Sequence, residues 1–138
     1  MKLLILCTGN SCRSQMAEAF LTSLNNTLEV KSAGTQPASN IHPKAIQVMD
    51  EKGIDLQDHY PKDVKQFIDQ SFDYVITVCD SANESCPAFT GKVDQRLHMG
   101  FEDPAEASGT ETDVLETFRN VRDQIETEFK KFYEKNLT

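Results

Sequence analysis

The sequence predicts an α/β fold. One domain over residues 1–138 holds a four-stranded, mainly parallel sheet, flanked by helices on both faces to give three layers. Segments rich in strand-forming residues alternate with segments of helical periodicity, and strand–helix–strand crossovers build parallel sheets. The 138 residues, 38% hydrophobic and 26% charged, are typical of a globular protein and long enough to bury a core without disulfides.

Four segments are predicted strands. Residues 3–6 form a continuous apolar run that ends at Cys7 and Gly9, as expected of a buried central strand. Residues 28–32, 74–78 and 93–98 are the others, the last with the weakest pattern. Functional groups collect at the carboxyl ends of parallel strands. Cys7 and Cys79, each expected one residue beyond a strand, should therefore lie on the same edge of the sheet.

The helices are read from periodicity and from their end signals. A first helix begins near Ser14, with Met16, Phe20 and Leu24 on its buried face. A second starts at Pro43 and stops at Gly53. Short helices are expected at 63–68 and directly after Cys79, and a long one at 111–133. Two capping boxes are predicted, one on the short helix after Cys79 and one on the long helix: Ser81 with Glu84, and Thr110 with Asp113.

The composition excludes several classes of protein. A formal net charge of −8 argues against a general nucleic-acid or anionic-membrane binder, because both need a basic surface. No run approaches the ~18 apolar residues of a membrane span, and the N-terminal apolar run is too short for a secretory signal. We therefore expect a cytoplasmic monomer. In that compartment four cysteines indicate reactive thiols, and their spacings are unlike those of zinc sites.

The segment from Cys7 to Ser14 has the composition of an anion-binding loop. Small residues between a strand and a helix allow backbone N–H groups to converge, and the helix start adds its dipole. The predicted binding residues are Thr8, Gly9, Asn10, Ser11, Cys12, Arg13 and Ser14. Arg13 offers a planar fork for two oxygens, and Cys7 is predicted to be a nucleophile of lowered pKa. The alternative is a buried cysteine at a tight turn with a surface arginine.

Asp103 precedes Pro104 in the loop before the last helix. Proline fixes φ and stiffens the chain, so Asp103 could be held over the anion loop and protonate a departing oxygen. A simple turn is the alternative reading of this dipeptide. None of His42, His59 and His98 clusters with another histidine in the sequence, and none is assigned to catalysis.

The sequence resembles a known family along most of its length. CTGNSCRSQMAE at 7–18 is similar to the active-site loop of thioredoxin-coupled arsenate reductases, which have the fold of low-molecular-weight protein tyrosine phosphatases. The similarity continues through KSAG at 31–34, HPKAI at 42–46, VCDSANESCP at 78–87 and GFEDPAEASGT at 100–110. The chain departs from the phosphatases at Gln15, where they carry proline, and at 105–107, where they carry aromatic residues. Both departures favour a small inorganic oxyanion.

The resemblance implies a three-cysteine relay. Cys7 attacks arsenate, Cys79 attacks Cys7 and releases arsenite, and Cys86 attacks Cys79 to leave a disulfide that thioredoxin reduces. It also supports Asp103 as the acid, implies phosphate and sulfate as competing anions, and requires no cofactor. Some members of the family hold potassium, here through Asn10, Glu18, Ser32 and Asp63. Cys12 would either fill space or pair with Cys7 on oxidation.

The two later cysteines carry a geometric constraint. If the segment between them is helical, Cys79 and Cys86 are about 10.5 Å apart along the helix axis. A disulfide needs Cα atoms within roughly 7 Å, so this helix would have to unwind. The alternative is that Cys79 packs at a strand end and Cys86 is incidental. A phosphatase of the same fold ranks second as a function, and a non-enzymatic thiol redox sensor third.

Overall fold

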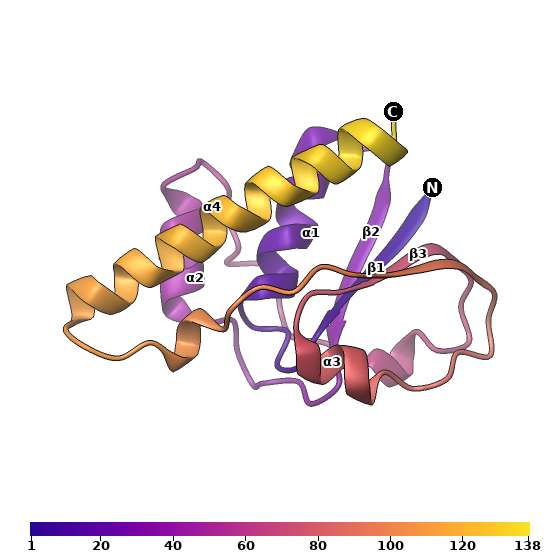
Figure 1. Ribbon diagram of the computed structural model, residues 1–138, viewed down its shortest axis with the longest axis horizontal. Coiled ribbons are helices and arrows are strands. Elements are labelled where there is room, and N and C mark those ends of the chain that lie inside the picture. The colour runs from indigo at the N-terminus through magenta and orange to yellow at the C-terminus, as the bar shows by residue number, and fades with distance from the viewer.

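The computed structural model describes all 138 residues. Its centre is a four-stranded sheet in the order β2-β1-β3-β4, in which every neighbouring pair is parallel. The strands are β1 (Lys2–Cys7), β2 (Glu29–Gly34), β3 (Phe72–Thr77) and β4 (Val93–His98). Figure 1 shows α1, α2 and α4 together on one side of the strands, with α3 at their carboxyl ends. The predicted α/β fold is confirmed.

The helices follow the predicted order with different bounds. They are α1 (Arg13–Leu24), α2 (Pro43–Asp50), α3 (Asp80–Ser85) and α4 (Glu111–Asn136), with 3-10 turns η1 (Val64–Gln66) and η2 (Pro104–Glu106). The helix expected at 63–68 is therefore only the short turn η1. None of the helices combines the length and hydropathy that a membrane crossing needs.

Two of the predicted helix starts are confirmed and one is wrong, and α2 ends at Asp50, three residues before the predicted stop at Gly53. Pro43 opens α2, and a reciprocal Thr110–Asp113 capping box opens α4. The capping box predicted from Ser81 and Glu84 is wrong, because the N-cap of α3 lies two residues before Ser81. Its N-cap is Cys79, whose Sγ accepts a hydrogen bond from the backbone N–H of Ala82 at 3.4 Å. A thiol is a weak acceptor, so this helix start is only loosely fixed.

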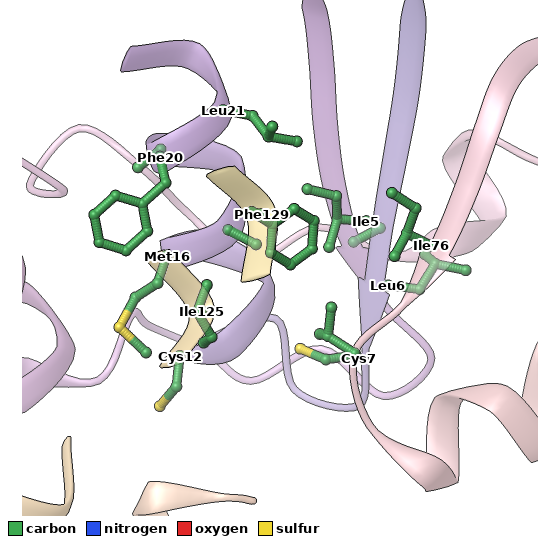
Figure 2. Close-up of a cluster of buried hydrophobic side chains, with 14 of the residues drawn as sticks. Ile5, Leu6, Cys7, Cys12, Met16, Phe20, Leu21, Ile76, Ile125 and Phe129 are labelled. Atoms are coloured by element: carbon green, nitrogen blue, oxygen red, sulfur yellow. The ribbon is translucent and has the colours of Figure 1, made fainter. Parts of the chain in front are cut away.

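The core lies between the sheet and the helices α1 and α4. Leu3, Leu4, Ile5 and Leu6 are fully buried, as expected of a central strand in a sheet covered on both faces. Figure 2 shows α1 and α4 side chains packed beside β1, with Cys7 and Cys12 at the lower edge of the cluster. Leu24 is 40% exposed, so the predicted buried face of α1 ends one turn early.

The sheet brings the two reactive segments to one edge. Cys7 is the last residue of β1 and not the residue after it, whereas Cys79 is the second residue after β3. The backbone N–H of Val78 donates to the carbonyl of Leu6 at 2.9 Å, which continues the pairing of β3 with β1 up to these cysteines. The predicted proximity of Cys7 and Cys79 therefore follows directly from strand register.

Candidate active site

The loop between β1 and α1 turns its carbonyl groups outward. The carbonyls of Cys7, Thr8, Gly9 and Ser11 accept backbone hydrogen bonds at 2.8–3.1 Å from the segment that follows β2. The backbone N–H groups of five loop residues have no acceptor within the protein: Thr8, Gly9, Ser11, Cys12 and Arg13. Successive unpaired N–H groups at a helix start form an anion-binding nest. The predicted oxyanion loop is therefore present in backbone geometry.

Asn10 holds the loop in this shape. It adopts the left-handed conformation, with φ of 52°, and its side chain is fully buried. Its Nδ2 donates to Ser14 Oγ at 2.7 Å, while its Oδ1 accepts from the backbone N–H of Lys62 at 2.9 Å. Asparagine tolerates this conformation better than most residues. Asn10 thus braces the loop through its side-chain hydrogen bonds.

A second layer of polar contacts fixes Asn10. Gln15 Nε2 donates to Asn10 Oδ1 at 3.0 Å and to the carbonyl of Tyr60 at 3.0 Å. His59 Nδ1 lies 3.0 Å from Gln15 Oε1 and 3.3 Å from a carboxylate oxygen of Glu18. The sequence assigned no role to His59, and no local pattern identifies one, because its partners are some 40 residues away.

Gly34 lets the loop sit against β2. A Cβ built at this position would overlap the carbonyl oxygen of Thr8 and crowd the backbone nitrogen of Asn10. Close backbone approach is one of the few reasons that a strand requires glycine. KSAG at 31–34, a part of the family resemblance, therefore contains a structural requirement of the anion loop.

Cys7 lies at the base of the nest with 2% of its surface exposed. Its Sγ is 2.8 Å from Ser14 Oγ and accepts from the backbone N–H of Asn10 at 3.1 Å. Burial nevertheless raises the pKa of Cys7 above its ordinary value, although Ser14, Asn10 and Arg13 act in the opposite direction. The prediction of a lowered pKa is therefore wrong for this structure. Loss of solvation outweighs the surrounding donors.

Cys12 differs from Cys7 in its surroundings. It is buried beside Met16 and Ile125 at the edge of the core cluster (Figure 2), and burial raises its pKa to about 12. A thiol of that pKa is inert at neutral pH. This favours packing over pairing with Cys7 for the Cys12 side chain, while its backbone N–H belongs to the nest.

Arg13 and Asp103 meet at the mouth of the loop. Arg13 Nη2 lies 3.6 Å from Asp103 Oδ2, and Nη1 donates to the carbonyl of Phe101 at 3.1 Å. Asp103 caps η2 by accepting from the backbone N–H of Ala105 at 3.0 Å. Asp103 thus forms the turn that one interpretation predicted, and its carboxyl also lies at the mouth of the nest beside Arg13. The turn interpretation and the acid interpretation are therefore compatible.

Cys79 lies beside the loop and Cys86 lies further away. Thr8 Oγ1 is 3.4 Å from Cys79 Sγ, which links the nest to the start of α3. Cys79 and Cys86 flank α3 at its two ends, and all four cysteines are free thiols. The predicted helix between the two cysteines is confirmed. By helix geometry its two ends are too far apart for a disulfide, so we expect it to unwind before these cysteines bond.

Three of the four residues predicted to bind potassium already have other polar partners, and one does not. Asn10 Oδ1 accepts two hydrogen bonds, Glu18 contacts His59, and Asp63 Oδ1 accepts from the backbone N–H of Lys65 at 2.9 Å. Ser32 Oγ is buried with no hydrogen-bond partner. No group of three or more His, Cys, Asp or Glu residues is arranged to hold a metal ion. An orphaned buried hydroxyl is nevertheless the feature that a hard cation would satisfy.

Comparisons with known proteins agree with this geometry. The family described as low molecular weight phosphotyrosine protein phosphatase matches residues 2–138. Arsenate reductases of Halalkalibacterium halodurans and Bacillus subtilis are 43% and 42% identical over 130 residues, which cover 94% of this chain and 92% of each relative.

Solved structures give the same result. An arsenate reductase in the phosphate binding state superposes with a TM-score of 0.81 at 32% identity over 97% of both chains. The thioredoxin-dependent arsenate reductase of Corynebacterium glutamicum gives a TM-score of 0.69 at 27% identity, over 97% of this chain and 60% of that one. The chain belongs to the low molecular weight phosphotyrosine protein phosphatase family and groups there with the arsenate reductases.

Proposed function

We propose that this protein reduces arsenate to arsenite through Cys7, Cys79 and Cys86, with thioredoxin as the final reductant. The position of Cys79 carries the proposal. Its Sγ lies at the edge of the anion nest, 3.4 Å from Thr8 Oγ1, and Cys86 follows one short helix later. Hydrolysis of a phosphate ester needs only Cys7, Arg13 and Asp103, so it gives no reason for this arrangement.

The first step forms a covalent adduct. Arsenate binds to the nest and to the fork of Arg13, and the Cys7 thiolate attacks arsenic(V). Asp103 donates its proton to the departing oxygen, which leaves as water. Since burial raises the pKa of Cys7, the reactive thiolate depends on hydrogen bonds from Ser14 and Asn10. Phosphate and sulfate have the same tetrahedral shape, and we expect them to compete.

The next steps transfer two electrons. Cys79 attacks Cys7 Sγ, a Cys7–Cys79 disulfide forms, and the electron pair of the sulfur–arsenic bond leaves with arsenite, now arsenic(III). Cys86 then attacks Cys79, which frees Cys7 and leaves a Cys79–Cys86 disulfide. Reduced thioredoxin supplies two electrons to restore both thiols. We place this cycle in the cytoplasm, where thiols are kept reduced.

The decisive experiment follows oxidation of reduced thioredoxin upon addition of arsenate. Mass spectrometry after one turnover without thioredoxin should find Cys7–Cys79 or Cys79–Cys86 disulfides. If arsenate does not increase the oxidation of thioredoxin, and aryl phosphates are hydrolysed rapidly, the chain is instead a phosphatase. Slow phosphatase activity alongside arsenate reduction is expected, because the same nest binds both anions.

We also propose a potassium site at Ser32, with Asn10, Glu18 and Asp63 as further oxygen ligands. The buried, unpartnered Ser32 Oγ supports it. Potassium would add charge behind the loop that Asn10 braces. Potassium chloride should raise the melting temperature more than sodium chloride of equal concentration, and Ser32→Ala should remove that difference. Equal stabilisation by both salts in the parent protein would contradict the site.

A further inference from the structure

Arg96 is the exception among the four arginines of this acidic chain. Arg13, Arg119 and Arg122 each lie within 3.6 Å of a carboxylate oxygen. Arg96 has no carboxylate within 4.0 Å. Its one polar contact to another side chain is with a thiol, where Nη1 lies 4.0 Å from Cys86 Sγ. An unpaired guanidinium beside a thiol favours the thiolate form.

The strand fixes the backbone of Arg96, and an aromatic ring contacts its guanidinium. Arg96 extends from β4, where it pairs in register with Val75 of β3. Its guanidinium carbon lies 5.3 Å from the centroid of the Phe89 ring, a cation–π contact. Phe89 follows Cys86 by three residues, so the same segment carries the thiol and the aromatic ring. The charge therefore remains next to Cys86 without a competing acid.

The surroundings of Cys86 explain why such a charge matters. Cys86 is partly buried and lines a cavity of about 330 Å³ together with Arg96, Leu97 and His98. Burial raises the pKa of Cys86, and Arg96 acts against this rise. His98 is the other basic group of this cavity. Its Nε2 lies 2.9 Å from Asp80 Oδ1 and its Nδ1 lies 2.8 Å from Thr77 Oγ1, so both ring nitrogens already have partners. Arg96 is thus the available cation.

We propose that Arg96 is a positioning residue for Cys86, which holds its sulfur as a thiolate for attack on Cys79. This inference rests on the relay proposed above. In that step the proton of Cys86 passes to solvent, a Cys79–Cys86 bond forms, and the Cys7–Cys79 bond breaks with its electron pair on Cys7. The step is an exchange without net oxidation.

The test measures Cys86 directly and needs no arsenate. The reduced chain, with all four cysteines present, is alkylated with iodoacetamide at several pH values, and the Cys86 peptide is quantified by mass spectrometry. Arg96→Gln should shift the pH profile of Cys86 upward and slow its alkylation at pH 7 roughly three- to tenfold. Arg96→Lys, which keeps the charge, should recover most of the rate.

The matched control is Lys92→Gln, which removes a cation just before β4 whose one charged partner is Asp94 at 3.5 Å. It should leave the Cys86 profile unchanged. An unchanged profile in Arg96→Gln, or equal shifts in both variants, would overturn the inference. The role of Arg96 and the relay can fail separately. The relay is contradicted if Cys86→Ser keeps full thioredoxin-coupled turnover, whatever the alkylation profile of Cys86 shows.

Discussion

The Oγ1 of Thr8 lies 3.4 Å from the Sγ of Cys79. This contact joins the anion loop to the segment that carries Cys79, so under the proposed function one residue of the loop would serve both substrate binding and the relay. Ala82 donates its backbone N–H to the same sulfur at 3.4 Å, which adds a donor from the start of α3. The sulfur of Cys79 therefore has two potential hydrogen-bond donors, one from the anion loop and one from α3.

Thr8→Val tests this link because it removes the hydroxyl and keeps the shape. A hydrogen bond contributes about 0.5–1.5 kcal/mol, so formation of the Cys7–Cys79 disulfide should slow about three- to tenfold. Single-turnover release of arsenite measures that step. Hydrolysis of p-nitrophenyl phosphate, which does not use Cys79, serves as the control. An equal loss in both assays would mean that Thr8 acts only on the anion loop.

Cys86→Ser should separate one turnover from many. The variant should still release about one equivalent of arsenite per protein, because Cys7 and Cys79 suffice for it. Thioredoxin-coupled cycling should then stop, and mass spectrometry should find Cys7–Cys79 as the accumulated disulfide. Undiminished multiple turnover would remove Cys86 from the relay.

Asp103→Asn tests the acid. Asp103 lies 3.6 Å from Arg13 across the mouth of the loop. Loss of a general acid lowers rates about 10²- to 10⁴-fold when the leaving oxygen is a poor one. Phenyl phosphate should show this loss more strongly than p-nitrophenyl phosphate, whose leaving group needs little protonation. Glu106→Gln, a nearby carboxylate in the same loop, is the control and should keep both rates.

Acid stability should depend on Glu51, which joins α2 to α4. Its carboxylate contacts Arg119 at 2.8 Å and Arg122 at 2.7 Å, and these arginines lower the pKa of Glu51 from 4.5 to about 2. A depressed pKa stabilises the fold above pH 4.5, and this contribution disappears as pH falls toward 2. Glu51→Gln should lower the melting temperature at pH 7 and flatten its decline between pH 4.5 and 2.

Glu116→Gln is the control for this measurement. Glu116 contacts Arg119 at 3.2 Å within the same helix and does not reach α2. An exposed pair of this kind contributes little. A pH profile of Glu51→Gln that parallels the parent between pH 4.5 and 2 would show that the cluster does not stabilise the protein.

The sequence predicted what depends on local pattern and strand register. The apolar run before Cys7 predicted this thiol at the carboxyl edge of the sheet, and the Asp103-Pro104 dipeptide predicted a carboxyl near the loop, where Asp103 contacts Arg13. Two errors were local. Cys79 acts as the N-cap of α3 in place of Ser81, and α1 exposes Leu24 because the core ends one turn earlier. Weak end signals cannot fix a boundary to one residue.

What the sequence could not predict depends on distant contacts and on solvation. Neither the contact of His59 with Gln15 nor that of Arg96 with Cys86 follows from spacing along the chain. The pKa of Cys7 was predicted in the wrong direction because the composition of the loop identifies its donors but not the burial of the sulfur. Burial is a property of the packed sheet and helices, and it outweighs those donors.

The packing of the loop against β2 leads to a last prediction, for Gly34→Ala. The added Cβ would overlap the carbonyl oxygen of Thr8, a backbone atom that cannot move without displacing the nest. Such overpacking costs typically about 1–3 kcal/mol. Gly91→Ala offers a matched control, since its Cβ would overlap the carbonyl oxygen of Gln70, far from the loop. Both variants should melt at lower temperature, but only Gly34→Ala should lose phosphate binding in a titration below its melting point. Retained phosphate affinity in Gly34→Ala would mean that the loop can form its nest without close approach to β2.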